Sequence, residues 1–356
     1  MRHLRSLLPD ELKLLMAERG EPAYRAAQIF SWCSRGVSHY DQMTNLPQEL
    51  RQWLAEQFIL TEPRILCRQV SAKDGTVKYL FGLYDGHAVE SVLMQYEHGR
   101  SLCISSQVGC RMGCRFCAST VGGLVRNLEA GELLDQMLFA AQDSGRRIDS
   151  LVLMGIGEPF DNYDNVVRFF RLVGHSDGVG LGLRHISVST CGLVPEIDRF
   201  AGEGLPITLS ISLHAPNNAL RDEMMPINRR HSVEEVVAAG HRYAERTGRR
   251  VYFEYVMIAG QNDGEREARA LGALLKGNLC HVNLIPLNPV RDKAQKSSDR
   301  TAIARFQRVL CACGVRSTVR RRLGEDIEAA CGQLRRSEIE LGFWEDDRPD
   351  GATEEP

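Results

Sequence analysis

The chain has 356 residues, of which 43% are hydrophobic, and its 44 basic residues nearly balance 46 acidic ones. This composition can bury a full-sized core, so it excludes a disordered chain and a single small module, and the length predicts two domains or one large domain with an appendage. The formal net charge of −2 is uneven: the last thirteen residues carry −5 and the remainder +3, which is compatible with a nucleic-acid partner without requiring one.

The N-terminal segment is basic, but its apolar stretch before Pro9 is too short for a secretion signal, and no apolar run could span a bilayer. We therefore expect a cytoplasmic protein without membrane contact. Its eleven cysteines are an odd and high number. A disulfide framework explains them poorly, so they indicate metal or redox chemistry.

Two kinds of hydrophobic period follow one another in the first hundred residues. Three stretches within residues 10–57 have apolar residues at helical spacing, which predicts a helical accessory domain over residues 1–60. The period then changes to two, and Asp74-Gly75 and Asp85-Gly86 favour tight turns between three strands. This pattern predicts a short antiparallel β extension over residues 61–98.

After about residue 100, apolar β-branched runs alternate with helical stretches. Strands are predicted over residues 101–106, 149–156, 184–190, 206–212, 251–257, 280–287 and 315–321. Helices are predicted over residues 131–142, 165–173, 233–245, 265–276 and 300–313. Such alternation is typical of parallel βαβ units in an open or closed barrel, which makes the fold class α/β.

Cys110, Cys114 and Cys117 form the strongest motif, a C-x3-C-x2-C in a glycine-containing loop after the first barrel strand. Three thiolates this close together can bind one metal centre. A structural zinc needs four ligands and usually takes them as two separated pairs, whereas an iron–sulfur cluster on three thiolates leaves one iron open to a substrate amine and carboxylate. The spacing favours the cluster, and a zinc knuckle completed by Cys103 or a histidine is the alternative.

Polar residues end four of the predicted strands. They are Gly157-Glu158, Ser189, Ser212-Leu213-His214 and Asn288. Because the C-terminal ends of barrel strands build the site, we expect cofactor contacts there, although ordinary turn chemistry explains Ser189 or Asn288 alone equally well. The run GIGEPF is no dinucleotide fingerprint, because Phe160 replaces its third glycine and Pro159 has no N–H for a phosphate.

Two further cysteines and one carboxylate stand out. Cys331 precedes a glycine, which allows a tight, mobile turn. Strand alternation places Cys103 on a polar, exposed face with two serines, although most cysteines are small buried hydrophobes. Glu90 shares its face with apolar side chains, where it could accept a proton during catalysis; an edge strand with solvent access is the alternative.

The cysteine motif, with Phe116 before its last cysteine and a βα barrel downstream, resembles the radical S-adenosylmethionine (SAM) superfamily. Within it the chain is similar, from about residue 20 to 340, to the RlmN-type adenosine methyltransferases of ribosomal and transfer RNA. The stretches that carry this resemblance are LCISSQVGCRMGCRFCAST, GGLVRNLEAGE, VLMGIGEPFDNYDN, SVSTCG, SISLHAPNN, LRDEMMPIN, HVNLIPLNPV and GEDIEAACGQLR. It implies a partial (βα)6 barrel over residues 99–340, a [4Fe–4S] cluster on the three cysteines, and SAM at the strand-end residues, with Glu158 on its amino group.

By the same resemblance Cys331 carries the methyl group, Cys103 resolves a protein–RNA adduct and Glu90 is the proton acceptor. One SAM methylates Cys331, and a second is cleaved to a 5′-deoxyadenosyl radical that activates this methyl group for transfer to C2 of adenosine. The implied partners are 23S rRNA, tRNA (the adenosine 3′ of the anticodon), a flavodoxin-like one-electron donor, and a thiol reductant for the Cys103–Cys331 disulfide. We expect a monomer.

Three alternatives stay open. The first is Cfr-type methylation at C8, and the second is a protein-modifying radical enzyme, which needs no paired Cys103 and Cys331. The third, from another class, is a zinc-stapled RNA-binding protein without chemistry. Arginines 229–230, 249–250, 320–322 and 335–336 are candidate RNA-phosphate contacts, although any one pair is more often a solvated surface. Residues 341–356 are predicted to be an acidic disordered tail.

Overall fold

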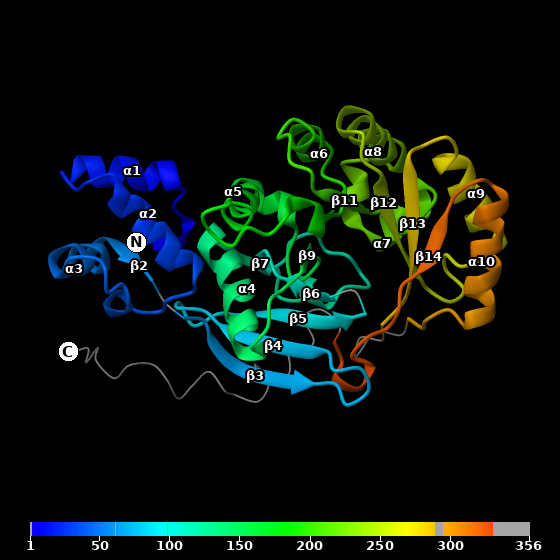
Figure 1. The fold of residues 1–356 in the computed structure, drawn as a ribbon. Helices are drawn as coiled ribbons and strands as arrows, with labels where there is room; N and C mark the ends of the chain where they lie inside the picture. Colours follow the sequence, from blue (N-terminus) through cyan, green and yellow to red (C-terminus); the bar gives the residue numbers. More distant parts are fainter. Residues whose placement is uncertain (1, 61, 98, 289–294, 330–356) are drawn as a thin grey trace, which may run out of the picture.

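The computed structural model describes residues 2–60, 62–97, 99–288 and 295–329. Figure 1 shows a long twisted sheet with helices along it and a group of short helices at the N-terminal end. This architecture confirms the predicted α/β class.

The N-terminal unit consists of short helices whose two ends are tied together. The α-helices are α1 (Pro9–Glu18), α2 (Tyr24–Ser34) and α3 (Gln48–Gln57). Apolar residues recur on one face of each, so that Leu12, Ile29 and Leu50 are buried. Strand β1 (Arg2–His3) pairs in parallel with β2 (Phe58–Ile59), so the unit begins and ends at the same place.

Ten strands of the described chain form one sheet. Their bounds, from one edge to the other, are β3 (Arg64–Val70), β4 (Val77–Gly82), β5 (Ala88–Tyr96), β6 (Gly99–Ile104), β9 (Ser150–Leu153), β10 (Ile186–Thr190), β11 (Thr208–Ser212), β12 (Val251–Met257), β13 (Cys280–Pro286) and β14 (Ser317–Val319). Strands β3 to β6 pair antiparallel, and from β6 onward the pairing is parallel. The β extension is therefore continuous with the barrel, and β6 is the strand at which the direction of pairing changes.

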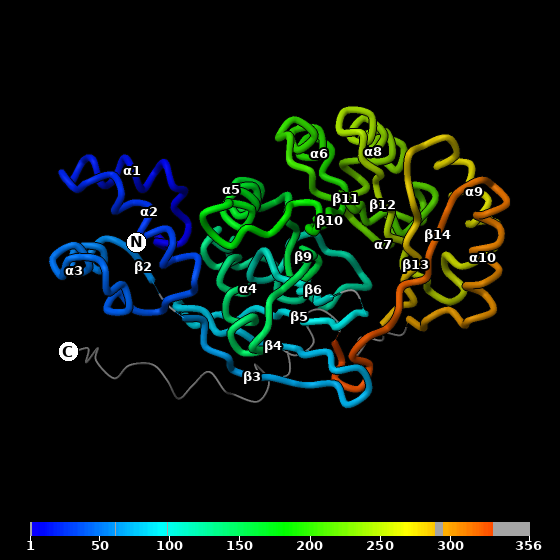
Figure 2. The backbone as a smooth tube through the Cα atoms, viewed as in Figure 1, coloured from blue at the N-terminus to red at the C-terminus, as the bar shows by residue number. Residues whose placement is uncertain are grey.

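Helices connect the parallel strands, and Figure 2 follows the chain through these units from β9 to β14. Five match the predicted helices: α4 (Ala130–Ser144), α5 (Tyr163–Val173), α8 (Val233–Thr247), α9 (Glu265–Leu275) and α10 (Arg300–Ala312). The sequence did not predict α6 (Val194–Phe200) and α7 (Asn218–Met224), because seven residues make only two turns and show little period. None of the described helices is long and apolar enough to cross a bilayer.

Shorter elements connect these helices and strands. The 3-10 helices are η1 (Leu4–Ser6), η2 (Tyr40–Gln42), η3 (Ala118–Thr120), η4 (Pro159–Asn162), η5 (Leu183–His185), η6 (Pro226–Arg229) and η7 (Glu325–Ile327). Strands β7 (Gln107–Gly109) and β8 (Leu124–Asn127) pair antiparallel as a separate two-stranded sheet. The cysteine loop lies between β7 and β8, so both of its ends are fixed.

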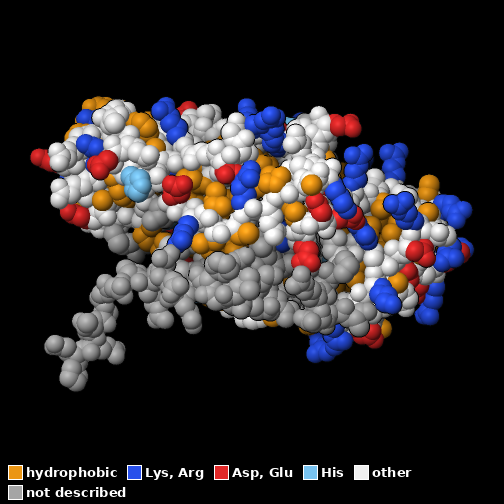
Figure 3. Space-filling model, turned by 90° about the horizontal axis from the view of Figure 1, so that it is seen from below, with side chains coloured by type: hydrophobic (Ala, Val, Ile, Leu, Met, Phe, Trp, Pro, Cys, Tyr) orange, Lys and Arg blue, Asp and Glu red, His pale blue; other side chains and the backbone are white. Residues whose placement is uncertain are grey.

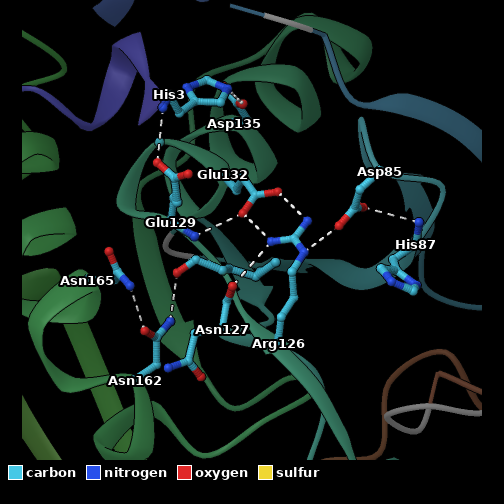
Figure 4. Close-up of polar contacts among 12 residues, drawn as sticks. His3, Asp85, His87, Arg126, Asn127, Glu129, Glu132, Asp135, Asn162 and Asn165 are labelled. Carbon is cyan, nitrogen blue, oxygen red and sulfur yellow. Dashed lines mark hydrogen bonds and ion pairs between the residues drawn. The ribbon is translucent and has the colours of Figure 1, made fainter. Parts of the chain in front are cut away.

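The start of α4 joins the N-terminal unit and the β extension to the barrel (Figure 4). The backbone N–H of His3 donates to the Glu129 carboxylate at 3.0 Å, at the helix N-terminus, where negative charge is favourable. Arg126 on β8 bridges Glu132, at 2.7 and 2.8 Å, to Asp85 in the turn between β4 and β5. These contacts hold both appendages against the barrel.

Candidate active site

Residues at the C-terminal ends of the parallel strands enclose a cavity of about 270 Å³. Most of the predicted metal and cofactor residues line it: Cys110, Cys114, Cys117, Gly157, Glu158, Ser189, Ser212, His214 and Asn288. Leu213 does not, because its side chain is fully buried in the core. The structure therefore brings together residues that are up to 178 positions apart in the sequence (110 to 288).

The loop from Cys110 to Cys117 presents its three thiols to this cavity. Gly113 has φ +71°, a conformation that favours glycine and lets the chain reverse between the first two cysteines. The backbone of Cys110 donates to Gly123 at 3.0 Å, and that of Cys117 to Cys114 at 3.1 Å. Burial raises the pKa of Cys110 to about 12 and raises that of Cys114 as well. A metal centre that binds these two thiols has to displace their protons.

Cys110, Cys114 and Cys117 line one and the same cavity. This arrangement fits an iron–sulfur cluster held by three thiolates, because each thiolate binds a different iron. Within the described residues, there is no group of three His, Cys, Asp or Glu side chains placed to hold a single metal ion.

Glu158 is held at the cavity by backbone donors. Its carboxylate accepts from the N–H of Cys191 at 2.7 Å and from that of Phe160 at 3.0 Å, and its own N–H donates to the Gln107 side chain at 2.8 Å. Burial raises the pKa of Glu158, although these hydrogen bonds favour the charged form. A buried carboxylate in this position can bind an ammonium group.

The neighbouring strand ends contribute hydroxyl and imidazole groups. The Oγ atoms of Ser189 and Ser212 lie 3.5 Å apart. His214 has φ +60°, unusual for a residue other than glycine, and its Nδ1 accepts from the N–H of Val256 at 3.0 Å. Burial lowers the pKa of His214 to about 3, so its ring is neutral and packs edge-on against Phe116 at 4.9 Å between centroids.

A second cavity of about 140 Å³ contains Cys103. The two cavities share lining residues: Met154, Ile285, Asn288 and Arg320. The prediction that Cys103 is exposed on a polar face is wrong, since it is 7% exposed and packs against Val92 and Met94. The reason is that Leu323 and Ala329, from the end of the described chain, cover this face.

Glu90 lies on the same sheet face as Cys103, because Val92 pairs directly with Cys103 and Glu90 is two residues from Val92. The edge-strand alternative is wrong: β5 lies between β4 and β6, and Glu90 is 3% exposed. Its carboxylate is 3.5 Å from the ammonium group of Lys78. Cys331 lies outside the described residues, and the described chain ends at Ala329, in the wall of the Cys103 cavity.

Comparison with known proteins agrees with this arrangement. Family models match the radical SAM superfamily over residues 104–271 and the ribosomal RNA large subunit methyltransferase N-terminal domain over residues 3–60. The chain is 50% identical over 337 residues to a probable dual-specificity RNA methyltransferase RlmN of Alkaliphilus metalliredigens, covering 95% of this chain and 96% of the relative. It is 52% identical to the protein of the same name from Symbiobacterium thermophilum, over 92% and 89%.

The chain belongs to the RlmN family of radical SAM RNA methyltransferases. A crystal structure of a radical SAM methyltransferase from Sphaerobacter thermophilus matches it with a TM-score of 0.89 and 45% identity, over 94% of this chain and 99% of that one. Membership of the RlmN family implies the [4Fe–4S] cluster and SAM that the predicted residues fit.

One residue of the site, Arg221, was not predicted from the sequence of this RlmN-family chain. It is completely buried, and its guanidinium donates to the carbonyl oxygens of Cys191 at 2.6 Å, Ser212 at 3.1 Å and Leu213 at 3.1 Å. It thereby joins the ends of β10 and β11. The run LRDEMMPIN contains Arg221, but a lone arginine on a short helix gives no signal of such a role.

The predicted arginine groups have different surroundings. Arginines 320–322 line the Cys103 cavity, and Arg230 lines a separate cavity beside the cysteine loop. Arg249 instead bonds to Ile207 and Thr208, so it stabilises the barrel, and residues 335–336 lie outside the described chain. On the face in Figure 3 many basic side chains gather at the end formed by α9, α10 and β14.

Proposed function

We propose that this protein methylates C2 of adenosine in 23S rRNA and in tRNA, at the adenosine 3′ of the anticodon, with a methyl group carried by Cys331. The observation that supports this most directly is the shared wall between the cavity with the three cysteines and the cavity with Cys103. A methyl group delivered to that wall would lie between the cofactor and the residue that releases the product. The relatives' name, dual-specificity RNA methyltransferase, is consistent with more than one RNA substrate.

The chemistry of adenine requires this indirect route. C2 is electrophilic and has no lone pair that could attack a sulfonium methyl group, so direct polar transfer fails. The methyl group has to be bound to a protein sulfur and lose a hydrogen before its carbon can bond to C2. A cluster held by Cys110, Cys114 and Cys117 would supply the one-electron chemistry that SAM cleavage needs, and with it the means to remove this hydrogen.

The chain's own residues have three tasks in this reaction. Cys110, Cys114 and Cys117 hold the cluster. Glu158 binds the SAM amino group, while the hydroxyls and amide of the neighbouring strand ends (Ser189, Ser212 and Asn288) orient the rest of the cofactor.

Cys103 and Glu90 release the product. The Cys103 sulfur attacks the Cys331 sulfur, the electron pair of the broken S–C bond passes to the methylene carbon, and that carbon takes a proton to become the methyl group. Before that attack, addition of the methylene carbon to C2 leaves one unpaired electron on the base. That electron would pass to a one-electron acceptor, a role the oxidised cluster on Cys110, Cys114 and Cys117 would supply, while Glu90 accepts the proton that C2 gives up. The resulting Cys103–Cys331 disulfide needs a thiol reductant, and the cluster needs a one-electron donor of the flavodoxin type.

The test is Cys103→Ala in anaerobically reconstituted protein with RNA. Cluster assembly, methylation of Cys331 and SAM cleavage use no Cys103 thiol, so they should stay at the wild-type level. RNA should accumulate covalently on the protein, as a species that survives denaturation and disappears with RNase.

Cys67→Ala, in a half-buried strand cysteine outside both cavities, is the matched control and should show normal turnover. Chromatography of the product nucleosides against 2-methyladenosine and 8-methyladenosine standards, with detection by mass spectrometry, distinguishes C2 from C8 methylation. Normal methylation without any adduct in Cys103→Ala would refute the two-cysteine mechanism.

A further inference from the structure

Lys78 on β4 is a completely buried lysine that joins two parts of the proposed catalytic machinery. Its side chain is 1% exposed, and its ammonium nitrogen lies 3.5 Å from Oε1 of Glu90 and 2.8 Å from the carbonyl oxygen of Glu328. An ammonium group has three N–H donors around a compact charge, so it can serve a carboxylate and a carbonyl in different directions. One side chain thus contacts the proposed proton acceptor and the chain three residues before Cys331.

The strand register places Lys78 on the Cys103 face of the sheet. Lys78 pairs with Val92, and Val92 pairs with Cys103, so these three side chains form a row across β4, β5 and β6. Glu90 lies beside this row, two residues from Val92. Lys78 and Glu90 therefore extend the Cys103 side of the site into the antiparallel part of the sheet.

The segment that Lys78 binds is docked on the turn between β3 and β4, as Figure 1 shows for the red end of the described chain. Asp326 accepts from the Ser71 hydroxyl at 2.7 Å and from the Ala72 N–H at 2.9 Å, and Asp74 accepts from the N–H of Gly324 at 2.8 Å. These contacts fix the start of the segment. The Lys78 bond fixes its end.

Glu328 itself has an unusual backbone. Its φ is +44°, and among the described residues only His214, in the cofactor cavity, is another non-glycine residue with positive φ. Such a conformation is strained for a residue that has a Cβ, and it persists only where its surroundings impose it. The hydrogen bond from Lys78 to the carbonyl of this residue is one such constraint.

We propose that Lys78 is a positioning residue for product release: it holds the Glu90 carboxylate in place on the Cys103 face and clamps the carbonyl of Glu328, and with it the chain that leads to Cys331. This inference rests on the proposed function. It also accounts for a buried ion pair whose charges are costly to remove from water.

The test compares Lys78→Met, which keeps an unbranched side chain but removes the charge, with Glu90→Gln and Lys78→Arg in reconstituted protein with RNA. Lys78→Met should still carry the methyl group on Cys331, because the Asp326 contacts remain. Its rate of product formation should fall on the order of tenfold to a hundredfold, with accumulation of the covalent RNA adduct, as in Glu90→Gln. Lys78→Arg, which keeps a cation, should recover part of the rate.

Lys73→Met is the matched control, because Lys73 is an exposed lysine of the same turn whose ammonium is 4.0 Å from Glu325; its rate should stay within about twofold of the wild type. Product formation at the wild-type rate in Lys78→Met would overturn the proposal, and so would loss of Cys331 methylation together with product. If Glu90→Gln itself turned over normally without adduct, the proposed function of Glu90 would fail instead.

If Lys78→Met does not fold, a second test is available. The double variant Lys78→Met/Glu90→Gln has no unpaired buried charge, and hydrogen exchange of amides 324–329 can be compared with Glu90→Gln alone. Faster exchange in the double variant supports the clamp. Equal exchange overturns it.

Discussion

Gly157 offers the sharpest test of how the cofactor cavity is built. Its φ is +106°, and a Cβ added there would lie 2.7 Å from Cβ and 2.8 Å from N of Gln107, and 2.8 Å from Oγ of Ser106. Ordinary contacts begin at about 3.5 Å, so Gly157→Ala must move the turn by about 0.5 Å or more. Two of these neighbouring atoms belong to Gln107, whose side chain also accepts a hydrogen bond from the N–H of Glu158. A shift of Gln107 should therefore move Glu158.

The displacement should be measurable as lost SAM affinity. A charged hydrogen bond is worth about 1.5–3 kcal/mol, and if Glu158 no longer reaches the SAM amino group, the dissociation constant should rise roughly ten- to a hundredfold. Isothermal titration of SAM into anaerobically reconstituted protein measures this change. Iron content and circular dichroism show whether the cluster and the fold survive.

Gly86→Ala is the matched control for backbone strain. Gly86 has φ +83° in the turn between β4 and β5, but a Cβ there would meet nothing within 4 Å. The Gly86→Ala substitution should lower the free energy of unfolding by about 1–2 kcal/mol without changing the affinity for SAM. Wild-type affinity for SAM in Gly157→Ala would refute the proposed effect on Glu158. Equal losses of SAM affinity in Gly157→Ala and Gly86→Ala would show that the loss comes from a general effect on the fold.

Three further predictions concern the cluster and the stability of the fold. Cys114→Ala should abolish the iron–sulfur chromophore, seen by absorption and iron analysis, because two thiolates hold a cluster poorly. Glu254→Gln should stabilise the metal-free protein by about 1–3 kcal/mol at pH 7.5 in urea unfolding, because Oε2 of this buried carboxylate has no hydrogen-bond partner within the described residues. Burial raises the pKa of Glu254 in the folded protein above its value in the unfolded chain. The stabilisation by Glu254→Gln should therefore be largest above the folded pKa and shrink as the pH falls toward the unfolded pKa. A stabilisation that does not change with pH would contradict this explanation. Arg5→Met should destabilise by about 3–5 kcal/mol, since it leaves the buried Asp135 carboxylate without the guanidinium 2.7 Å away, whereas Arg2→Met at an exposed pair should cost under about 1 kcal/mol.

The sequence predicts well those features that depend on neighbours in the chain. Alternation along 184–190 predicts β10, and the structure confirms that Ile186 and Val188 are buried while Ser187 and Ser189 line inner cavities. The position of Glu158 and His214 just after their strands is enough to place them at one rim, because parallel strands end on the same side. Local pattern and barrel topology together therefore predict the cofactor cavity.

Features that depend on distant segments could not be predicted in the same way. Cys103 is buried because Leu323 and Ala329 cover its face. The local pattern of β6 cannot predict contact with a segment more than 200 positions away in the sequence. The bonds of Arg221 to β10 and β11 and of Lys78 to Glu328 are likewise long-range. Nothing in the sequence around Arg221 or Lys78 indicates these bonds.

The change of strand direction at β6 explains how one sheet can serve both halves of the proposed reaction. On the parallel side, strand ends gather Glu158, Ser189 and Ser212 at one rim, which suits a cofactor with several polar groups. On the antiparallel side, residues directly opposite each other share a face, so Lys78, Val92 and Cys103 align across three strands. Because Cys103 lies on β6 itself, it belongs to both patterns. The antiparallel strands β4 and β5 thus extend the sheet beyond the barrel and bring Lys78 and Glu90 to the face of Cys103, where the proposed product release takes place.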